Sequence, residues 1–174
     1  NYPEDRTETV EIENSKEDET KGSRTVPFSN TLYVDREDFM EEPVKGYFRL
    51  FPGNEVRFKG AYFIRCEEVV KDAEGRVTEL RCCYDPETRS GSGFEGRKVK
   101  GTIHWVDAKT AVPVRVRAYS HLMVEDESGA NVLNPLSVKT YDAFAEACVA
   151  DAAAGDRFQF FRHGYFMADP ILTN

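Results

Sequence analysis

The 174-residue sequence has no apolar run of the roughly 18–20 residues that a membrane-spanning helix requires. It begins at Asn1 without an initiator methionine, and its first residues have neither the basic nor the apolar part of a signal peptide. This start suggests a chain excised from a longer protein. We therefore expect a cytoplasmic protein with no membrane partner.

Cysteine and histidine are few and scattered. The four cysteines form no Cys-x-x-Cys pair and the three histidines stand far apart, whereas a zinc site needs ligands clustered at short spacing. Cys82 and Cys83 are adjacent, so a vicinal disulfide is an alternative to two reduced strand cysteines, which are far more common. We expect no metal site and no redox role.

Motifs of enzyme active sites are absent as well. The sequence has no Walker A loop, no GxGxxG, no HExxH and no GxSxG. His104 precedes Trp105 in an apolar segment, where a histidine is more often a structural partner than an acid or base. Glu67 and Glu68 are neighbours in a predicted strand, so their side chains point to opposite faces and form no carboxylate dyad. We expect this chain to hold no active site and no cofactor.

The net charge of −8 is unevenly distributed along the chain. Residues 1–44 contain 5 lysines and arginines against 13 acidic residues, residues 45–117 contain 15 against 10, and residues 118–174 contain 3 against 8. A basic middle between acidic flanks is able to present a positive face to phosphates. Ordinary solvated charge on strand exteriors explains the same distribution equally well, so charge alone leaves both interpretations open.

Short alternating segments separated by turn residues dominate the sequence. The clearest is a hairpin in which residues 67–71 and 76–84 flank a turn that ends in glycine. A second hairpin is predicted for residues 157–167. The other predicted elements are also short: strands at 9–12, 32–34, 55–58, 61–66, 99–106 and 112–119, a helical turn at 35–40 and a short helix within 140–154. Many short strands with little helix predict an all-β fold of the barrel or sandwich kind.

Residues 96–106, with the sequence GRKVKGTIHWV, resemble a signature in the C-terminal region of bacterial-type glutaminyl-tRNA synthetases. Further segments resemble the same region in the same order, and they lie at 22–24, 26–28, 33–39, 71–75 and 158–166. The HIGH-like and KMSKS-like catalytic motifs of class I synthetases do not occur. The resemblance is therefore to the anticodon-binding region, over about residues 20–168.

The resemblance implies a specific architecture. The family has two six-stranded barrels, similar to ribosomal protein L25, which are stacked end to end and exchange their N-terminal strands. Residues 15–112 would form most of the distal barrel, and residues 113–174 together with 1–14 would form most of the proximal one. The anticodon loop would lie across both barrels.

The resemblance also implies partners and a function. The partners are the anticodon loop of tRNA(Gln) and the catalytic domain of the same polypeptide, and a monomer is expected. The whole enzyme attaches glutamine to this tRNA and uses ATP and magnesium. The anticodon carries C or U, then U, then G.

Four residues match anticodon-binding positions of the family. Arg49 matches the arginine at the third base, guanine, and Arg57 matches the arginine at the wobble base. Gln159 and Arg162 match the pair at the central uracil. The planar fork of arginine suits guanine acceptors or a phosphate, and an amide is able to accept from the uracil ring N–H while donating to a carbonyl. Surface arginines in salt bridges and an ordinary exposed amide are the alternative interpretation.

Lys45 and Lys59 are weaker candidates for phosphate contacts, which add affinity but carry no sequence information. Phe48 stands where the family often has a second basic residue, so either a phosphate contact is lost or a stacking ring replaces it. The family's last strand has no counterpart before Asn174. Omission of such a strand would open the proximal barrel and expose an edge.

Three alternatives remain open from the sequence. One is the anticodon-binding domain of a glutamyl-tRNA synthetase of archaeal or eukaryotic type, which shares this region but usually differs in the Ile-His-Trp segment. Another is a stand-alone L25-like barrel that binds ribosomal RNA. The last is a protein-interaction domain that uses the acidic flanks.

Overall fold

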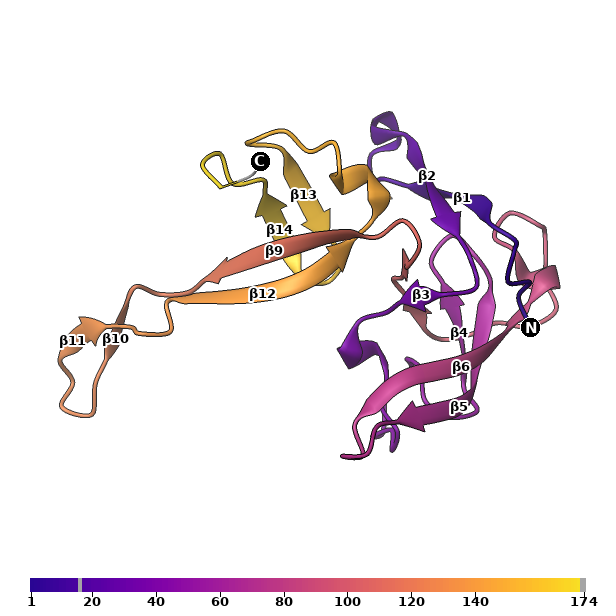
Figure 1. Ribbon diagram of the computed structural model, residues 1–174, viewed down its shortest axis with the longest axis horizontal. Helices are drawn as coiled ribbons and strands as arrows, with labels where there is room; N and C mark the ends of the chain where they lie inside the picture. The colour runs from indigo at the N-terminus through magenta and orange to yellow at the C-terminus, as the bar shows by residue number, and fades with distance from the viewer. Residues whose placement is uncertain (16, 173–174) are drawn as a thin grey trace.

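The computed structural model describes residues 1–15 and 17–172 (Figure 1). We call residues 1–111 the N-terminal part and residues 112–172 the C-terminal part. Among the described residues there is no α-helix and no helix long and apolar enough to cross a membrane. The predicted all-β class is confirmed.

In residues 1–15 and 17–172 the strands are short, and four 3-10 turns lie between them. The strands are β1 (Glu8–Glu13), β2 (Ser23–Phe28), β3 (Leu32–Tyr33), β4 (Glu55–Phe58), β5 (Phe63–Lys71), β6 (Val77–Asp85), β7 (Thr102–Ile103), β8 (Val106–Asp107), β9 (Val112–Tyr119), β10 (Met123–Glu125), β11 (Asn131–Leu133), β12 (Val138–Ala145), β13 (Arg157–Phe160) and β14 (Gly164–Met167). The 3-10 turns are η1 (Glu19–Lys21), η2 (Arg36–Asp38), η3 (Pro86–Thr88) and η4 (Ala147–Val149).

The hydrophobic core lies in the N-terminal part. Its four-stranded sheet has the order β6-β5-β4-β7, antiparallel except for the parallel pair β4–β7. Along β4, Val56 and Phe58 are buried, whereas Arg57 between them faces the opposite side of the sheet. Phe28 and Trp105 meet edge to face in this core, with ring centroids 5.0 Å apart. The alternation of β4 thus directs one candidate arginine away from the core.

Strand β1 belongs to this core. It pairs antiparallel with β2, and the buried side chains of Val10 and Ile12 pack in the same cluster as Val56 and Trp105. The segment 1–14, which the resemblance assigned to the proximal barrel, therefore buries its apolar side chains with the N-terminal part. The division at residue 112 and the two six-stranded barrels stay predictions.

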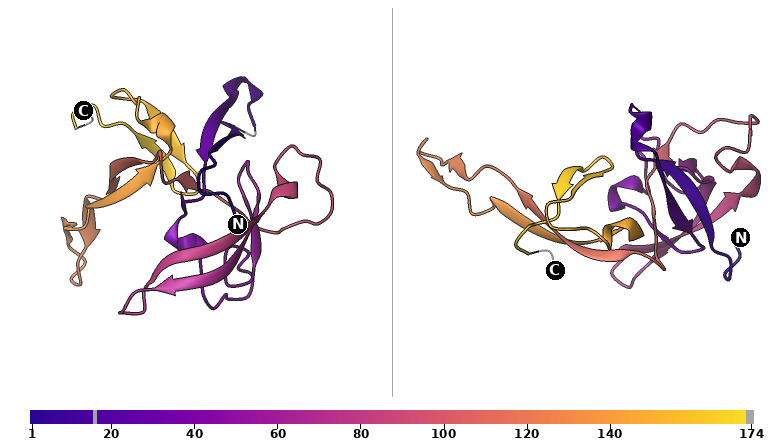
Figure 2. Two further views of the ribbon diagram at one scale, coloured as in Figure 1. Left: turned by 45° about the vertical axis from the view of Figure 1, so that its right-hand side comes forward. Right: turned by 90° about the horizontal axis from the view of Figure 1, so that it is seen from above.

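The C-terminal part consists of three two-stranded ladders. β9 and β12 pair over eight residues, from Val112 opposite Ala145 to Tyr119 opposite Val138. The β10–β11 ladder continues this ribbon away from the N-terminal part, whereas the β13–β14 hairpin lies beside the end of the β9–β12 ribbon that is nearer the N-terminal part (Figures 1 and 2). Beyond residue 111, Ala145 is the one buried apolar side chain in the described chain. Within residues 112–172, the C-terminal part therefore forms no buried apolar cluster of its own.

Both predicted hairpins are confirmed, as β5–β6 and β13–β14. The strand predicted at 99–106 is instead two short strands, β7 and β8, which pair with β4 and β3 respectively. Trp105 lies between them, with its ring buried and its Nε1 donating to the Lys59 carbonyl at 3.0 Å. The buried Trp105 thus fixes, in the core, the segment that links the strand paired with β4 to the strand paired with β3.

The short helix predicted within residues 140–154 is present only as one 3-10 turn. Residues 140–145 belong to β12, and only Ala147–Val149 form a 3-10 turn. The alanines of this segment favour a helix, but propensity is a weak determinant and pairing with β9 outweighs it.

Candidate nucleic-acid interface

Two predicted site residues from different parts of the chain meet at Asp38. Arg162 Nη1 donates to Asp38 Oδ1 at 2.6 Å, and its Nη2 forms a second, shorter contact with Oδ2. Arg49 Nη1 lies 3.3 Å from the same Oδ1. The Asp38 side chain has no exposed surface, so the carboxylate lies beneath the two guanidinium groups. Its hydrogen bonds raise the pKa of the Arg162 guanidinium, which stays charged.

Local backbone contacts fix this cluster. Asp38 ends η2, and its carbonyl accepts from Leu50 N at 3.0 Å, which places it beside Arg49. Arg162 lies in the turn after β13, with φ +69°. A non-glycine residue in this left-handed region costs about 1 kcal/mol or more and persists where its surroundings impose it. The paired contact with Asp38 supplies that restraint.

A surface pocket of about 490 Å³ opens beside this cluster. Its lining residues are Gly46, Tyr47, Phe48, Arg49, Lys100, Gly101, Thr102 and Arg162. The Phe48 ring is half exposed, and Lys100 Nζ lies 5.1 Å from its centroid. Exposed rings and cations side by side suit an unstacked base and its phosphate. The sequence left two outcomes for Phe48, and its exposure beside two arginines fits a stacking ring.

Arg57 lies in a separate pocket. Its Nη1 donates to the Thr88 carbonyl at 3.2 Å and to Ser90 Oγ at 3.0 Å, and its guanidinium lies 4.2 Å from the centroid of the Phe63 ring. Burial lowers the pKa of this guanidinium. The pocket has about 300 Å³ and is lined by Arg57, Arg89, Ser90, Gly91, Gly93, Phe94 and Glu95. Arg57 is thus held against the glycine-rich loop at residues 90–93, and among the described residues it forms no hydrogen bond or ion pair with Asp38.

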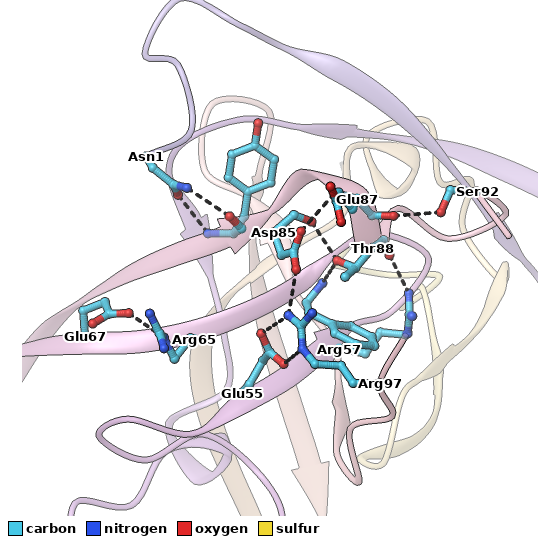
Figure 3. A network of polar contacts seen from close by, with 12 residues as sticks. Asn1, Glu55, Arg57, Arg65, Glu67, Asp85, Glu87, Thr88, Ser92 and Arg97 are labelled. Atoms are coloured by element: carbon cyan, nitrogen blue, oxygen red, sulfur yellow. Dashed lines mark hydrogen bonds and ion pairs between the residues drawn. The ribbon is translucent and has the colours of Figure 1, made fainter. Parts of the chain in front are cut away.

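A neighbouring ion-pair network stabilises the Arg57 pocket (Figure 3). Arg97 donates to both carboxylate oxygens of Glu55, at 2.6 and 2.8 Å, and to Asp85 at 2.7 Å. Its guanidinium also lies 5.3 Å from the Phe63 ring centroid. Arg97 therefore joins β4, β6 and the loop before β7, and it shares the Phe63 ring with Arg57.

The remaining candidates lie outside both pockets. Gln159 is exposed on β13 opposite Tyr165, a residue 84% exposed, so both side chains lie on one face of the hairpin. Lys59 Nζ lies 4.7 Å from the Phe161 ring centroid. Lys45 is exposed and forms no ion pair with the residues that the structure describes. Gln159 and Arg162 come from the same hairpin, but no direct contact joins them.

Sequence reasoning missed three residues of this interface: Asp38, Lys100 and Arg97. Asp38 lies within the predicted helical turn, and Lys100 and Arg97 lie within the signature segment, but no sequence pattern marks any of the three as a site residue. The acidic run around Asp38 gave no signal for a buried carboxylate, because its partner Arg162 is 124 positions away. No cluster of three or more potential metal ligands occurs among residues 1–15 and 17–172.

A second ion-pair cluster joins the two parts of the chain. Glu146, after β12, accepts from Arg24 Nε at 2.6 Å and from Arg24 Nη2 at 2.8 Å. His104 Nε2 lies 2.7 Å from the Glu146 carboxylate. This arrangement agrees with the structural role expected for His104. We call these three residues the Glu146 latch.

The pKa of Glu146 makes the latch sensitive to acid. Burial acts to raise this pKa, but the hydrogen bonds from Arg24 and His104 outweigh it and lower the pKa to about 2, from an ordinary value of 4.5. As the pH falls, the unfolded chain therefore binds a proton at this glutamate before the folded chain does. Stabilisation by Glu146 is complete above about pH 4.5 and is lost as the pH falls through about 2.

We expect Glu146 ionisation to contribute about 3 kcal/mol to the free energy of unfolding near pH 5 and almost nothing near pH 2. Urea unfolding of the wild type and of Glu146→Gln across this pH range measures the contribution. The difference between the two proteins should shrink steadily toward low pH. A difference that stays constant would show that the carboxylate charge is not what stabilises the latch.

Comparison with known proteins agrees with the resemblance. Two family models, both described as the anticodon-binding domain of class I tRNA synthetases for glutamate and glutamine (E and Q), match residues 1–85 and 102–169. A protein of Clostridium perfringens named glutamine–tRNA ligase is 54% identical over the whole chain, which covers 33% of that relative.

Proteins of the same name show similar identity in other bacteria. The one from Clostridioides difficile is 54% identical over 99% of the chain, and the one from Pseudomonas putida is 50% identical over 97%. The chain covers 32% and 31% of these two relatives, and thus spans about a third of the length of the curated relatives it matches. The chain belongs to the family of anticodon-binding domains of class I glutamyl- and glutaminyl-tRNA synthetases.

Proposed function

We propose that this chain is the anticodon-recognition part of a glutamine–tRNA ligase. It binds the (C/U)UG anticodon of tRNA(Gln), and a catalytic domain of the same polypeptide attaches glutamine with ATP and magnesium. We place this monomeric enzyme in the cytoplasm. The observation that carries the proposal is the convergence of Arg49 and Arg162 on Asp38, beside an exposed aromatic ring and a lysine.

Each candidate residue receives a role in this proposal. Arg49 binds the third base, guanine, whose two major-groove acceptors suit a planar fork. Arg162 and Gln159 bind the central uracil, for which the Gln159 amide supplies both an acceptor and a donor. Arg57 binds the wobble nucleotide in its own pocket, and this separation agrees with a base that is splayed away from the other two.

Phosphates supply the remaining contacts. Lys45 and Lys59 stay candidates for this role, and Lys100 joins them because its ammonium group lies over Phe48 within the larger pocket. Such contacts add affinity but no sequence preference. They also make binding fall as the salt concentration rises, because bound cations are released from the RNA.

The proposed function is tested by titrating this chain with a glutamine anticodon stem-loop and with variants at the central and third bases. We expect the cognate loop to bind more tightly than either variant, and its affinity to fall as salt is raised. A ribosomal RNA duplex serves as the competitor. Stronger binding to that duplex than to the cognate loop would favour an L25-like function and would exclude anticodon recognition.

Arg49→Ala is expected to weaken binding of the cognate loop by about 1–3 kcal/mol and to leave the third-base variant nearly unchanged, because arginine forks discriminate guanine by about this amount. Titration of both loops with both proteins measures the change. Arg115→Ala is the matched control, since Arg115 pairs with Asp142 on the exposed ribbon. An equal loss for both loops would assign Arg49 to a phosphate.

A further inference from the structure

The buried carboxylate of Asp38 occupies a position between the proposed recognition of two adjacent bases. We propose that Asp38 is a positioning residue that couples recognition of the central and third anticodon bases through Arg162 and Arg49. The inference rests on the proposed function and extends it to a residue that has no exposed surface. Asp38 therefore acts on the RNA only through the two arginines.

A single carboxylate oxygen is shared by both guanidinium groups. Asp38 Oδ1 accepts from Arg162 Nη1 at 2.6 Å and lies 3.3 Å from Arg49 Nη1. Two cations this close repel each other, and the anion between them removes most of that cost. If one arginine moves and displaces the carboxylate of Asp38, the contact between Asp38 and the other arginine changes as well. The two side chains are therefore coupled through one atom.

The paired contact between Arg162 and Asp38 also determines which N–H groups of Arg162 remain available to the RNA. A guanidinium has five N–H donors in a fixed plane, and the paired contact of Arg162 with Asp38 uses two of them. Both Arg162 and Arg49 line the larger pocket, so their other donors face a ligand there. Asp38 thus selects the edge of each guanidinium that is presented to a base.

The backbone around the cluster offers few alternatives. Asp38 is tied to the strand-like segment of Arg49 through the Leu50 N–H, and Phe39 forms a bridge with Leu50. Arg162 is held in the left-handed region at φ +69°. Glu37 adds a carbonyl that accepts from Arg49 Nη1 at 3.2 Å. A change at one arginine is therefore transmitted to the other through Asp38 and not absorbed by the loop.

The test measures discrimination ratios with this chain. Each ratio is the dissociation constant for a variant stem-loop divided by that for the cognate loop, determined separately for the central and the third base. We expect Asp38→Asn, which keeps the shape but removes the charge, to lower both ratios by about fivefold or more. Arg162→Ala should lower the third-base ratio as well as the central one, and Arg49→Ala should lower the central ratio as well as the third.

Controls separate this coupling from damage to the fold. Asp142, on β12, forms an exposed ion pair with Arg115, on β9. Asp142→Asn removes the charge of this carboxylate and should leave both ratios unchanged. If Asp38→Asn does not fold, the crossed effects of the two arginine variants still decide the question. Arginine variants that each alter only their own base would overturn the inference, as would an Asp38→Asn protein with wild-type ratios. A wild-type chain that discriminates neither base would instead overturn the proposed function itself, and the inference with it.

Discussion

Glu146→Ala is expected to lower the free energy of unfolding by about 3 kcal/mol, because breaking a buried ion pair leaves its partners without compensation. The Glu146 side chain is only 10% exposed, and Arg24, its principal partner, is 28% exposed. Alanine would leave the Arg24 guanidinium with one side-chain contact, to Asn14 Oδ1 at 3.0 Å. His104 would lose its partner at the same time.

The loss should extend to RNA binding, since the latch is one of the contacts that join the two parts of the chain. Besides the latch and the Asp38 cluster, these contacts include the stacked rings of Tyr33 and Phe144, 4.6 Å apart. Urea unfolding and titration with the cognate stem-loop measure the two effects. Asp142→Ala is the control, because an exposed pair contributes little. A Glu146→Ala protein with wild-type stability would show that the latch does not hold the parts together.

Local elements of the fold were predictable from the sequence for a physical reason. The β5–β6 hairpin is specified by residues adjacent in the chain, since its turn begins at Asp72 and ends at Gly75, whose φ is +81°. The alternation along β4 and β9 is equally local. The short helix predicted within residues 140–154 is limited to one 3-10 turn, because residues 140–145 pair with a distant strand, β9. Propensity describes a segment alone, and that pairing depends on the rest of the chain.

The candidate site also depends on contacts between residues that are far apart in the sequence. Arg49, Arg57, Gln159 and Arg162 were found through the resemblance, and the structure places Arg49 and Arg162 together and Arg57 elsewhere. The role of Asp38 depends on its separation from Arg162 by 124 positions. No periodicity or spacing rule connects side chains so far apart in sequence. The buried carboxylate of Asp38 is therefore a feature of this interface that the structure identifies and the sequence does not.

Gly101→Ala is expected to destabilise the chain by about 3 kcal/mol, near the upper end of the cost of overpacking, and to abolish selective binding of the third base. Gly101 is buried close to the backbone of Phe48 and to the side chain of Val56 on β4. A Cβ atom there would lie 1.9 Å from the Phe48 carbonyl oxygen and 3.3 Å from Val56 Cγ1. The atom in the way belongs to the backbone, so the segment that carries Arg49 must move.

Gly96→Ala provides the matched comparison. Its added Cβ would lie 2.8 Å from Phe94 Cζ, the tip of a side chain that is able to turn aside, so we expect a much smaller loss of stability. Thermal unfolding of both variants, and titration with cognate and third-base stem-loops, separate the two positions. If Gly101→Ala lowers stability but keeps third-base discrimination, the position of Arg49 does not depend on this close approach. If it loses both, the packing of one glycine against the Phe48 carbonyl sets the geometry with which Arg49 meets its base.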